Sequence, residues 1–410
     1  MDLNWSPEEQ AFEAEVRAFL ATSLTPELQR AGRLSTSVYA DHHASMKWQE
    51  ILVAKGWAAP HWAPEHGGTD WTVAQHYIWN RERIAAAAPG LSPMGISMVA
   101  YVIMKYGTLE QQRFFLPRIL SGEIFFCQGY SEPGSGSDLA SLQTSAVEDG
   151  DDLIINGQKV WTTHASEANW IFALVRTSKD GRPQQGITFL LIDMTTPGVE
   201  VRPFTMSSGE QIQNAVFFTD VRVPKANVMG EIDRGWSVAK YLLEFERGGN
   251  AYAPALKARA DAIARHAAET IGSDGQPLID DAVFATKLAR ARARADVLEI
   301  MELRLLSAAN GDGSVGALSS LMKIMGTELA GTLTELTMEA AGDRGLVYQP
   351  HATMPGGPVP RHNPPADGYV SGEEWHALAP LRYMNERAGP IYAGSNEIQR
   401  NIIAKQVLGL

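Results

Sequence analysis

The sequence contains one cysteine, Cys127, in 410 residues. A single cysteine excludes an intrachain disulfide and favours a reducing, intracellular compartment. No His-containing motif lies near it in the sequence, so we interpret Cys127 as a buried packing residue rather than a nucleophile.

Positive charge and long apolar runs are also scarce. The chain has 35 Lys and Arg against 47 Asp and Glu, a net charge of −12. This balance argues against a general nucleic-acid or membrane-surface binder, although a local basic patch could receive an anionic ligand. The N-terminus is acidic where a targeting peptide would be basic, and the most apolar stretch, 85–104, is interrupted by Pro and Gly. We therefore expect a soluble cytoplasmic protein with no nucleic-acid or membrane partner.

Several catalytic motifs are missing. Segment 134–139 begins like a dinucleotide-binding fingerprint, but Leu139 replaces its third glycine. A serine nucleophile elbow fails at 129–133 because its last position is Pro133. No Walker A lysine motif and no His-Glu-x-x-His pair occur, and the histidines lack metal-ligand spacing. Hydrolase, kinase and metalloenzyme functions are disfavoured, and we expect no metal.

What is present divides the chain into three parts. A capping box with Pro7 at the first helical position precedes apolar residues at helical spacing from Phe12 to Leu20. With further helices at 46–55, 72–87 and 109–120, this predicts an N-terminal helical domain over 1–124. Asn156-Gly157 between apolar runs predicts a hairpin. Further strands at 170–175, 187–192, 199–203 and 214–223 predict a small β-barrel or sandwich over 125–232.

Helices return in the last part, 233–410. They are expected at 236–245, 254–271, 279–309, 318–341 and 396–408. Six prolines in 348–376 predict an extended loop there. The fold class is mainly α with a central β-domain between two helical domains, because the strands are not alternated with helices.

Four separated segments carry the functional signal. They are Gln128–Asp138, Asn156–Thr163 with the nearby Ala168–Trp170, Phe217–Pro224 and Ile391–Ala404. Together, in this order over nearly the whole chain, they resemble the acyl-CoA dehydrogenase family. The residue types fit: glycines let backbone approach a ligand, Trp161 offers a flat face, and Thr163 offers a hydroxyl to a flavin nitrogen. Taken alone, a tight turn and a core tryptophan would be the simpler interpretation.

The resemblance implies a fold, a reaction and a set of residues. It implies FAD-dependent dehydrogenation of an acyl-CoA thioester to trans-2-enoyl-CoA, with electrons passed to an electron-transfer flavoprotein. It assigns Ser137, Glu244 and Arg247 to the substrate. It assigns to the cofactor eight residues, namely Tyr130, Ser131, Gly136, Ser137, Trp161, Thr163, Ser395 and Glu397.

The sequence departs from the family at the catalytic base. Many members carry a Glu where this chain has Ala393, which has no titratable group. A minority place the Glu on the first helix after the β-domain, and Glu246 falls on that position. Glu244 lies about 200° around that helix, so the two carboxylates do not share a face. Glu246 is the candidate base, with a pKa expected to be raised beside an acyl chain. The alternative is a solvated carboxylate beside Arg247.

A second departure concerns assembly. Family homotetramers carry an Arg-x-x-Phe-Gly segment that reaches a neighbour's FAD, and none occurs here. Arg259 and Arg265 are possible replacements, but they lie about 240° apart on a helix and are expected to point to different faces. Some family members instead pair two different polypeptides. We therefore expect a tetramer, possibly α2β2 with a small subunit, in which this chain carries the base.

Two alternative functions and the identity of the acyl group are left open by the sequence. An acyl-CoA oxidase shares the fold but passes electrons to O2, and a non-catalytic partner subunit would hold a structural or vacant flavin site. The acyl group is not determined by the sequence. A dicarboxylyl, bulky branched or steroid-derived acyl-CoA is the expectation, from resemblance to the paired-subunit branch alone.

Overall fold

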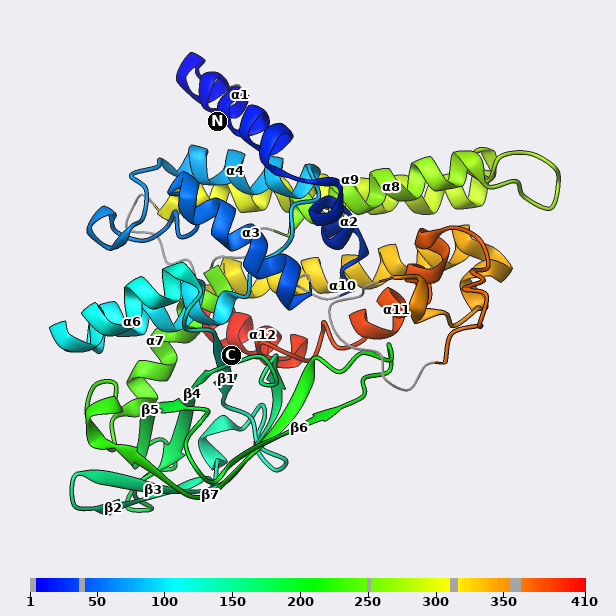
Figure 1. Ribbon diagram of the computed structural model, residues 1–410. Coiled ribbons are helices and arrows are strands. Elements are labelled where there is room, and N and C mark those ends of the chain that lie inside the picture. The colour runs from blue at the N-terminus through cyan, green and yellow to red at the C-terminus, as the bar shows by residue number, and fades with distance from the viewer. Residues whose placement is uncertain (1–4, 37–40, 249–251, 310–315, 354–362) are drawn as a thin grey trace.

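The computed structural model describes residues 5–36, 41–248, 252–309, 316–353 and 363–410, with the side chains of 244–248, 306–309 and 316–317 outside that description. Helices from both ends of the chain pack together, and a curled sheet lies at one end of the molecule (Figure 1). The predicted fold class, mainly α with a central β-domain, is confirmed. No helix in the described ranges has the length and apolar character to cross a membrane.

The N-terminal helices follow their caps. The capping box is present: the Glu9 N–H donates to Ser6 Oγ at 3.2 Å and the Ser6 N–H donates to Glu9 Oε2 at 2.7 Å. The helices are α1 (Pro7–Ser23), α2 (Pro26–Leu34), α3 (His42–Lys55), α4 (Val73–Ala85), a π-helical segment (Met94–Val99) continued by α5 (Ala100–Tyr106), and α6 (Leu109–Ser121). Helices α2 and α5 were not predicted, because α2 is short and α5 follows a Pro- and Gly-rich stretch.

One seven-stranded sheet forms the central part. Its strands are β1 (Phe126–Gly129), β2 (Ser145–Asp149), β3 (Asp152–Thr163), β4 (Trp170–Arg176), β5 (Ile187–Asp193), β6 (Val199–Phe204) and β7 (Gln213–Pro224). The order is β1-β4-β2-β3-β7-β6, with β5 paired to β4. Strands β4 and β5 are almost wholly buried, which explains their continuous apolar sequence.

The predicted Asn156-Gly157 hairpin is wrong. Both residues lie inside β3, at a register shift against β7, and the tight turn connects β2 to β3 instead. Gly157 has φ +144°, and a Cβ there would approach Thr144 Cα to 2.7 Å. The glycine therefore serves a bulge and a close approach of two strands, and sheet pairing overrides the local turn preference.

The C-terminal part is a set of long helices. They are α7 (Gly235–Gly248), α8 (Ala253–Glu269), α9 (Ala282–Ala309), α10 (Gly316–Ala341), α11 (Glu374–Glu386) and α12 (Asn396–Ile403), which continues as a π-helical segment (Ala404–Leu408). The expected loop over 348–376 overlaps the start of α11, while 363–373 is irregular and 354–362 lies outside the description. Helix α11 was not predicted because Pro380 lies inside it.

A buried carboxylate holds the start of α8. Glu302 is 2% exposed, and it accepts the N–H groups of Tyr252 at 2.6 Å and Ala253 at 3.0 Å. These are donors that a helix start leaves without intrahelical partners. Burial raises the pKa of Glu302 from 4.5 to about 7, although the two backbone donors oppose the shift.

This carboxyl should make stability fall with pH. Between pH 4.5 and 7 the folded chain keeps a proton on Glu302 that the unfolded chain has lost, so stability decreases across this window, by roughly 3 kcal/mol in all. Glu302→Gln keeps an acceptor for the backbone donors and should remove this decline. Urea unfolding of both proteins from pH 4.5 to 8 measures the difference, and parallel curves would contradict the assignment.

Candidate cofactor and substrate site

A β-bulge at the end of β3 exposes Trp161. Lys159 pairs with Val216 and Thr162 with Asn214, so two residues of β3 oppose one of β7. Trp161 lies in this bulge with φ +62°, a conformation that is unfavourable for an aromatic residue, and 64% of it is exposed. Its ring contacts Phe204 edge-on at 5.1 Å between centroids. A strained backbone that holds a large aromatic face in solvent is typical of a binding surface.

Trp161→Ala should separate binding from folding. Because the side chain is largely exposed, unfolding free energy should change by about 0.5 kcal/mol or less. Loss of the ring face should raise the dissociation constant of FAD roughly 10- to 100-fold. Fluorescence titration of flavin-depleted protein measures this, with Trp161→Phe as the control that keeps a ring. Unchanged affinity for FAD in the alanine variant would remove Trp161 from the site.

Thr163, two positions after Trp161, has a hydroxyl group that a hydrogen bond holds in place. Gln213 Nε2 donates to Thr163 Oγ1 at 2.9 Å, which leaves the hydroxyl proton available to a ligand acceptor. Gln213 Oε1 and Thr162 Oγ1 are buried without a hydrogen-bond partner among the described residues. Buried polar atoms of this kind need an explanation, and a polar ligand at the end of β3 would supply one.

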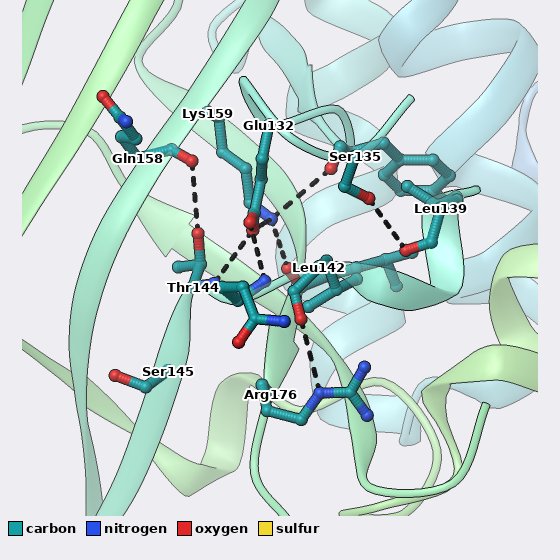
Figure 2. Close-up of polar contacts among 12 residues, drawn as sticks. Glu132, Ser135, Leu139, Leu142, Thr144, Ser145, Gln158, Lys159 and Arg176 are labelled. Atoms are coloured by element: carbon teal, nitrogen blue, oxygen red, sulfur yellow. Dashed lines mark hydrogen bonds and ion pairs between the residues drawn. The ribbon is translucent and has the colours of Figure 1, made fainter. Parts of the chain in front are cut away.

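The loop after β1 is fastened to β3 by a buried ion pair (Figure 2). Lys159 is fully buried and its Nζ donates to Glu132 Oε1 at 2.7 Å and to the Leu174 carbonyl at 2.7 Å. Glu132 also accepts the N–H groups of Gln143 at 2.6 Å and Thr144 at 2.9 Å. Burial lowers the pKa of Lys159 to about 8, although the Glu132 charge opposes the shift.

Further hydrogen bonds fix the same loop. Val160 N–H donates to the Ser131 carbonyl at 2.9 Å, beside the bulge that carries Trp161. Ser135 Oγ donates to the Asp138 carbonyl at 3.0 Å, and Arg176 Nη2 donates to the Ala140 carbonyl at 2.6 Å. The loop is therefore held at a fixed place relative to β3 and β4. Glu132 and Lys159 were not singled out from the sequence, although a lysine among alternating buried residues of a strand requires a buried partner.

The predicted cofactor residues of this loop differ in exposure. Tyr130 is buried with its ring against Phe172 and Phe189, so it supports the loop from the core. Ser131 is half-buried, whereas Gly136 and Ser137 are exposed. A Cβ at Gly136 would meet no atom within 4 Å. Packing within the chain therefore does not require this glycine, and its backbone is open to a ligand.

The last two predicted cofactor residues begin α12. Ser395 caps the helix by accepting the Ile398 N–H at 3.4 Å, and Glu397 is exposed. Buried side chains of α10 hold this segment: Lys323 Nζ donates to Asn396 Oδ1 at 2.9 Å, and Ser320 Oγ donates to Gln399 Oε1 at 2.7 Å. Helix α12 lies between α10 and the sheet (Figure 1). Among the described residues, no hydrogen bond or ion pair joins Ser395 or Glu397 to Trp161 or Thr163.

The candidate base lies on α7. Glu246, Glu244 and Arg247 fall within its helical range, but their side chains lie outside the described residues. Helix α7 packs against β5 and the Met94–Val99 segment, and its buried residues include Val238 and Leu242. Ala393, at the alternative position for the base, has φ +53° in the loop before α12. Within the described part of the chain, no group of three His, Cys, Asp or Glu side chains could hold a metal ion.

A cavity of about 1140 Å³, here called the helical cavity, lies among α2, α4, α8, α10 and α11. Tyr392 and Ala393 contribute to its wall. Its volume reaches beyond the range usual for small-molecule pockets, about 300–1,000 Å³. Arg259 and Arg265 both line it, and they lie six residues apart on α8 (Ala253–Glu269). The cavity is wide, and Arg259 Nη1 donates to Glu386 Oε1 at 2.8 Å across it to α11.

Comparison with known proteins gives matches over the whole chain. The N-terminal, middle and C-terminal domain models of the acyl-CoA dehydrogenase family match residues 6–123, 127–221 and 233–408. Acyl-CoA dehydrogenase FadE26 of Mycobacterium tuberculosis is 34% identical over 100% of this chain and 99% of its own length. Acyl-CoA dehydrogenase IpdE1 of the same organism is 36% identical, with 98% and 97% covered.

Comparison with solved structures also gives matches over the whole chain. The ChsE4–ChsE5 complex from Mycobacterium tuberculosis contains a chain that is 32% identical, with a TM-score of 0.79 and coverage of 100% of this chain and 99% of that one. The Tcur3481–Tcur3483 steroid ACAD matches with a TM-score of 0.81 at 26% identity, with the same coverage of both chains.

Proposed function

Because the chain belongs to the acyl-CoA dehydrogenase family of oxidoreductases, we propose that it converts an acyl-CoA thioester to the trans-2-enoyl-CoA with FAD as cofactor. One observation carries the proposal. Trp161 and Thr163 are presented at the end of β3, on a bulge that is bonded to the loop bearing Gly136 and Ser137. This surface offers a flat aromatic face, a free hydroxyl proton and open backbone, which fit a flavin ring.

We assign separate roles to the residues of the site. Trp161 holds the flat face of the ring, the Thr163 hydroxyl donates to a ring nitrogen, and Gly136 and Ser137 admit the cofactor to the backbone. Ser395 and Glu397 complete the cofactor set from α12. When bound, FAD supplies the acceptor for the hydride that leaves the β-carbon. Glu246 removes the α-proton, and Ser137, Glu244 and Arg247 contact the substrate.

The electron acceptor separates this proposal from an oxidase. We propose an electron-transfer flavoprotein as the acceptor, so reduced enzyme should react slowly with air. Stopped-flow mixing of the substrate-reduced protein with O2 tests this. Rapid return of the oxidised flavin spectrum with formation of peroxide would identify an acyl-CoA oxidase instead.

The same proposal includes the domain limits 1–124, 125–232 and 233–410 and a cytoplasmic location.

Cys127, the only cysteine of the chain, is buried, and burial raises the pKa of its thiol. Such a thiol is poorly reactive, which fits a packing role.

We also propose an α2β2 tetramer with a second polypeptide. Arg259 and Arg265 line a cavity of their own chain, and Arg259 is paired with Glu386. Neither arrangement favours a role at the flavin pyrophosphate of a neighbouring subunit. The similarity to chains of the two-component ChsE4–ChsE5 and Tcur3481–Tcur3483 structures supports the pairing.

This chain purified alone should therefore be deficient in FAD. Loss of one partly buried Arg–phosphate contact costs a few kcal/mol, roughly 10- to 100-fold in affinity. Flavin absorbance per polypeptide, measured with the mass in solution, should give less than one FAD per chain. Addition of the partner subunit should raise the flavin content. A stable homotetramer with close to one FAD per chain would contradict the pairing.

The acyl group that we propose is bulky. The helical cavity supports this by its size, and a relative whose structure is described as a steroid ACAD supports it by analogy. A panel of CoA thioesters, added under anaerobic conditions, should bleach the flavin only with ring-bearing or branched acyl groups. Bleaching by short straight chains alone would contradict this choice.

A further inference from the structure

The helical cavity contains a cation that no carboxylate of the described residues neutralises. Arg83 on α4 lines the cavity and is only partly accessible. It forms no ion pair with any described residue, and its Nη2 donates to Asn80 Oδ1 at 2.5 Å. Burial lowers the pKa of Arg83 to about 10, which still leaves it charged at neutral pH. An isolated buried charge is costly unless a ligand or partner compensates it.

Asn80 makes this end of the cavity a donor site. The hydrogen bond fixes its amide with Oδ1 toward Arg83, so its Nδ2 group is left as a donor. Asn80 also lines the cavity, one helical turn before Arg83. The charge of Arg83 also reaches His61, whose pKa is lowered by burial and then by that charge. The Arg83–Asn80 pair therefore presents N–H groups and positive charge.

Three other arginines of the cavity are accounted for differently, and Arg33, which also lines it, is exposed. Arg382 on α11 donates from Nε to the Ser35 carbonyl at 2.9 Å and from Nη2 to the Arg33 carbonyl, so it fastens the end of α2. Arg259 is paired with Glu386. Arg265 is exposed, so water screens its charge. Arg382 is equally sheltered and also has no ion pair among the described residues, but its donors are bound by backbone carbonyls, whereas Arg83 donates to a side-chain amide.

Part of the remaining wall is apolar, although Arg33, Glu373 and Glu374 also line the cavity. Ile84 of α4 lies next to Arg83 in sequence, and Leu256, Ile263, Leu333 and Leu378 come from the C-terminal helices. Ala393 adds only a methyl group where many family members have a carboxylate. A ligand that matches this end of the cavity has a bulky apolar skeleton and an anionic group that faces Arg83.

We propose that the Arg83–Asn80 pair binds a carboxylate at the end of the acyl group remote from the thioester. The substrate is then a bulky acyl-CoA that carries a second, free carboxyl group. The guanidinium and the amide together supply parallel donors to the two carboxylate oxygens. This inference rests on the proposed function, because it identifies the cavity with the acyl pocket.

A binding experiment tests the pair without flavin or turnover. Adamantane-1-carboxylate and the neutral adamantane-1-carboxamide are titrated into the full-length protein by calorimetry. The wild type should bind the carboxylate roughly 10- to 100-fold more tightly than the carboxamide, as expected for a charged hydrogen bond in a sheltered site. Arg83→Met should abolish this preference, and Arg83→Lys should keep part of it.

Arg265→Met is the matched control, since it removes an exposed arginine of the same cavity and should leave the preference unchanged. Circular dichroism confirms that each variant is folded. The proposal fails if the wild type binds neither probe, if it binds both equally, or if Arg83→Met keeps the preference. It also fails if Arg265→Met loses as much as Arg83→Met, because the effect is then general electrostatics.

Two thioesters distinguish this inference from the proposed function. One acyl-CoA carries a free terminal carboxylate on a ring skeleton, and the other carries its methyl ester. The acid form should bleach the flavin with a kcat/KM at least about 10-fold higher. Equal bleaching by both would overturn the carboxylate site and leave the dehydrogenase intact. No bleaching by any thioester would overturn the proposed function, while the calorimetric result would stand.

Discussion

Glu246→Gln should reduce the rate of dehydrogenation by roughly 1,000-fold or more while FAD remains bound. The substitution keeps the size of the side chain but removes the group that accepts the α-proton. General-base catalysis contributes about 10²–10⁴-fold, and no second base stands at the alternative position, which is Ala393. Anaerobic stopped-flow measurement of flavin reduction gives the rate directly.

The control for this experiment is Glu231→Gln, which removes an exposed carboxylate just before α7 and should leave the rate unchanged. If Glu246 is instead a solvated carboxylate, both variants will reduce flavin at the wild-type rate. Equal rates would therefore remove Glu246 from the mechanism. Absence of flavin from the Glu246→Gln variant would show that the residue acts in cofactor binding.

Disruption of the buried Lys159–Glu132 pair should cost about 3–5 kcal/mol and should release flavin. Lys159→Met leaves a carboxylate, 8% exposed, with only backbone donors, and a buried charge that has lost its partner is strongly destabilising. The loop that carries Gly136 and Ser137 would lose its ion-pair attachment to β3 and keep the hydrogen bond from the Val160 N–H to the Ser131 carbonyl. Urea unfolding and the flavin content of the purified variant measure the two effects.

A double-mutant cycle shows whether the pair acts as a unit. Lys159→Met combined with Glu132→Gln should be less destabilised than the sum of the two single variants. The exposed pair of Arg222 with Asp149 is the comparison, because Arg222→Met should destabilise the protein far less than Lys159→Met does. Equal costs for the buried and the exposed pair would contradict the role assigned to Lys159.

Local signals predicted much of the secondary structure. The box formed by Ser6 and Glu9 marks the start of α1, and the apolar runs at 170–175 and 187–192 correspond to β4 and β5. Such features depend on residues a few positions apart. Asn156-Gly157 failed because its conformation is set by pairing with β7 and by the approach of Thr144, both distant in sequence.

The site depends even more on distant contacts. The motif around Trp161 indicated a ligand, but the bulge that exposes its ring needs the register against β7. The partnership of Glu132 with Lys159 needs two segments that are 27 residues apart. The helical cavity needs helices from both ends of the chain, and neither Arg83 nor Asn80 belongs to a motif. Resemblance to a family suggested the reaction that we propose, whereas packing revealed the cavity.

The identity of the product tests whether the chain dehydrogenates an acyl-CoA thioester. The holoprotein is incubated with a ring-bearing acyl-CoA and an artificial electron acceptor, and the thioester is then analysed by mass spectrometry. We expect a product that has lost two hydrogens, with the new double bond between C2 and C3, together with one equivalent of reduced acceptor. Recovery of unchanged thioester from a protein that holds FAD and its partner subunit would contradict the account.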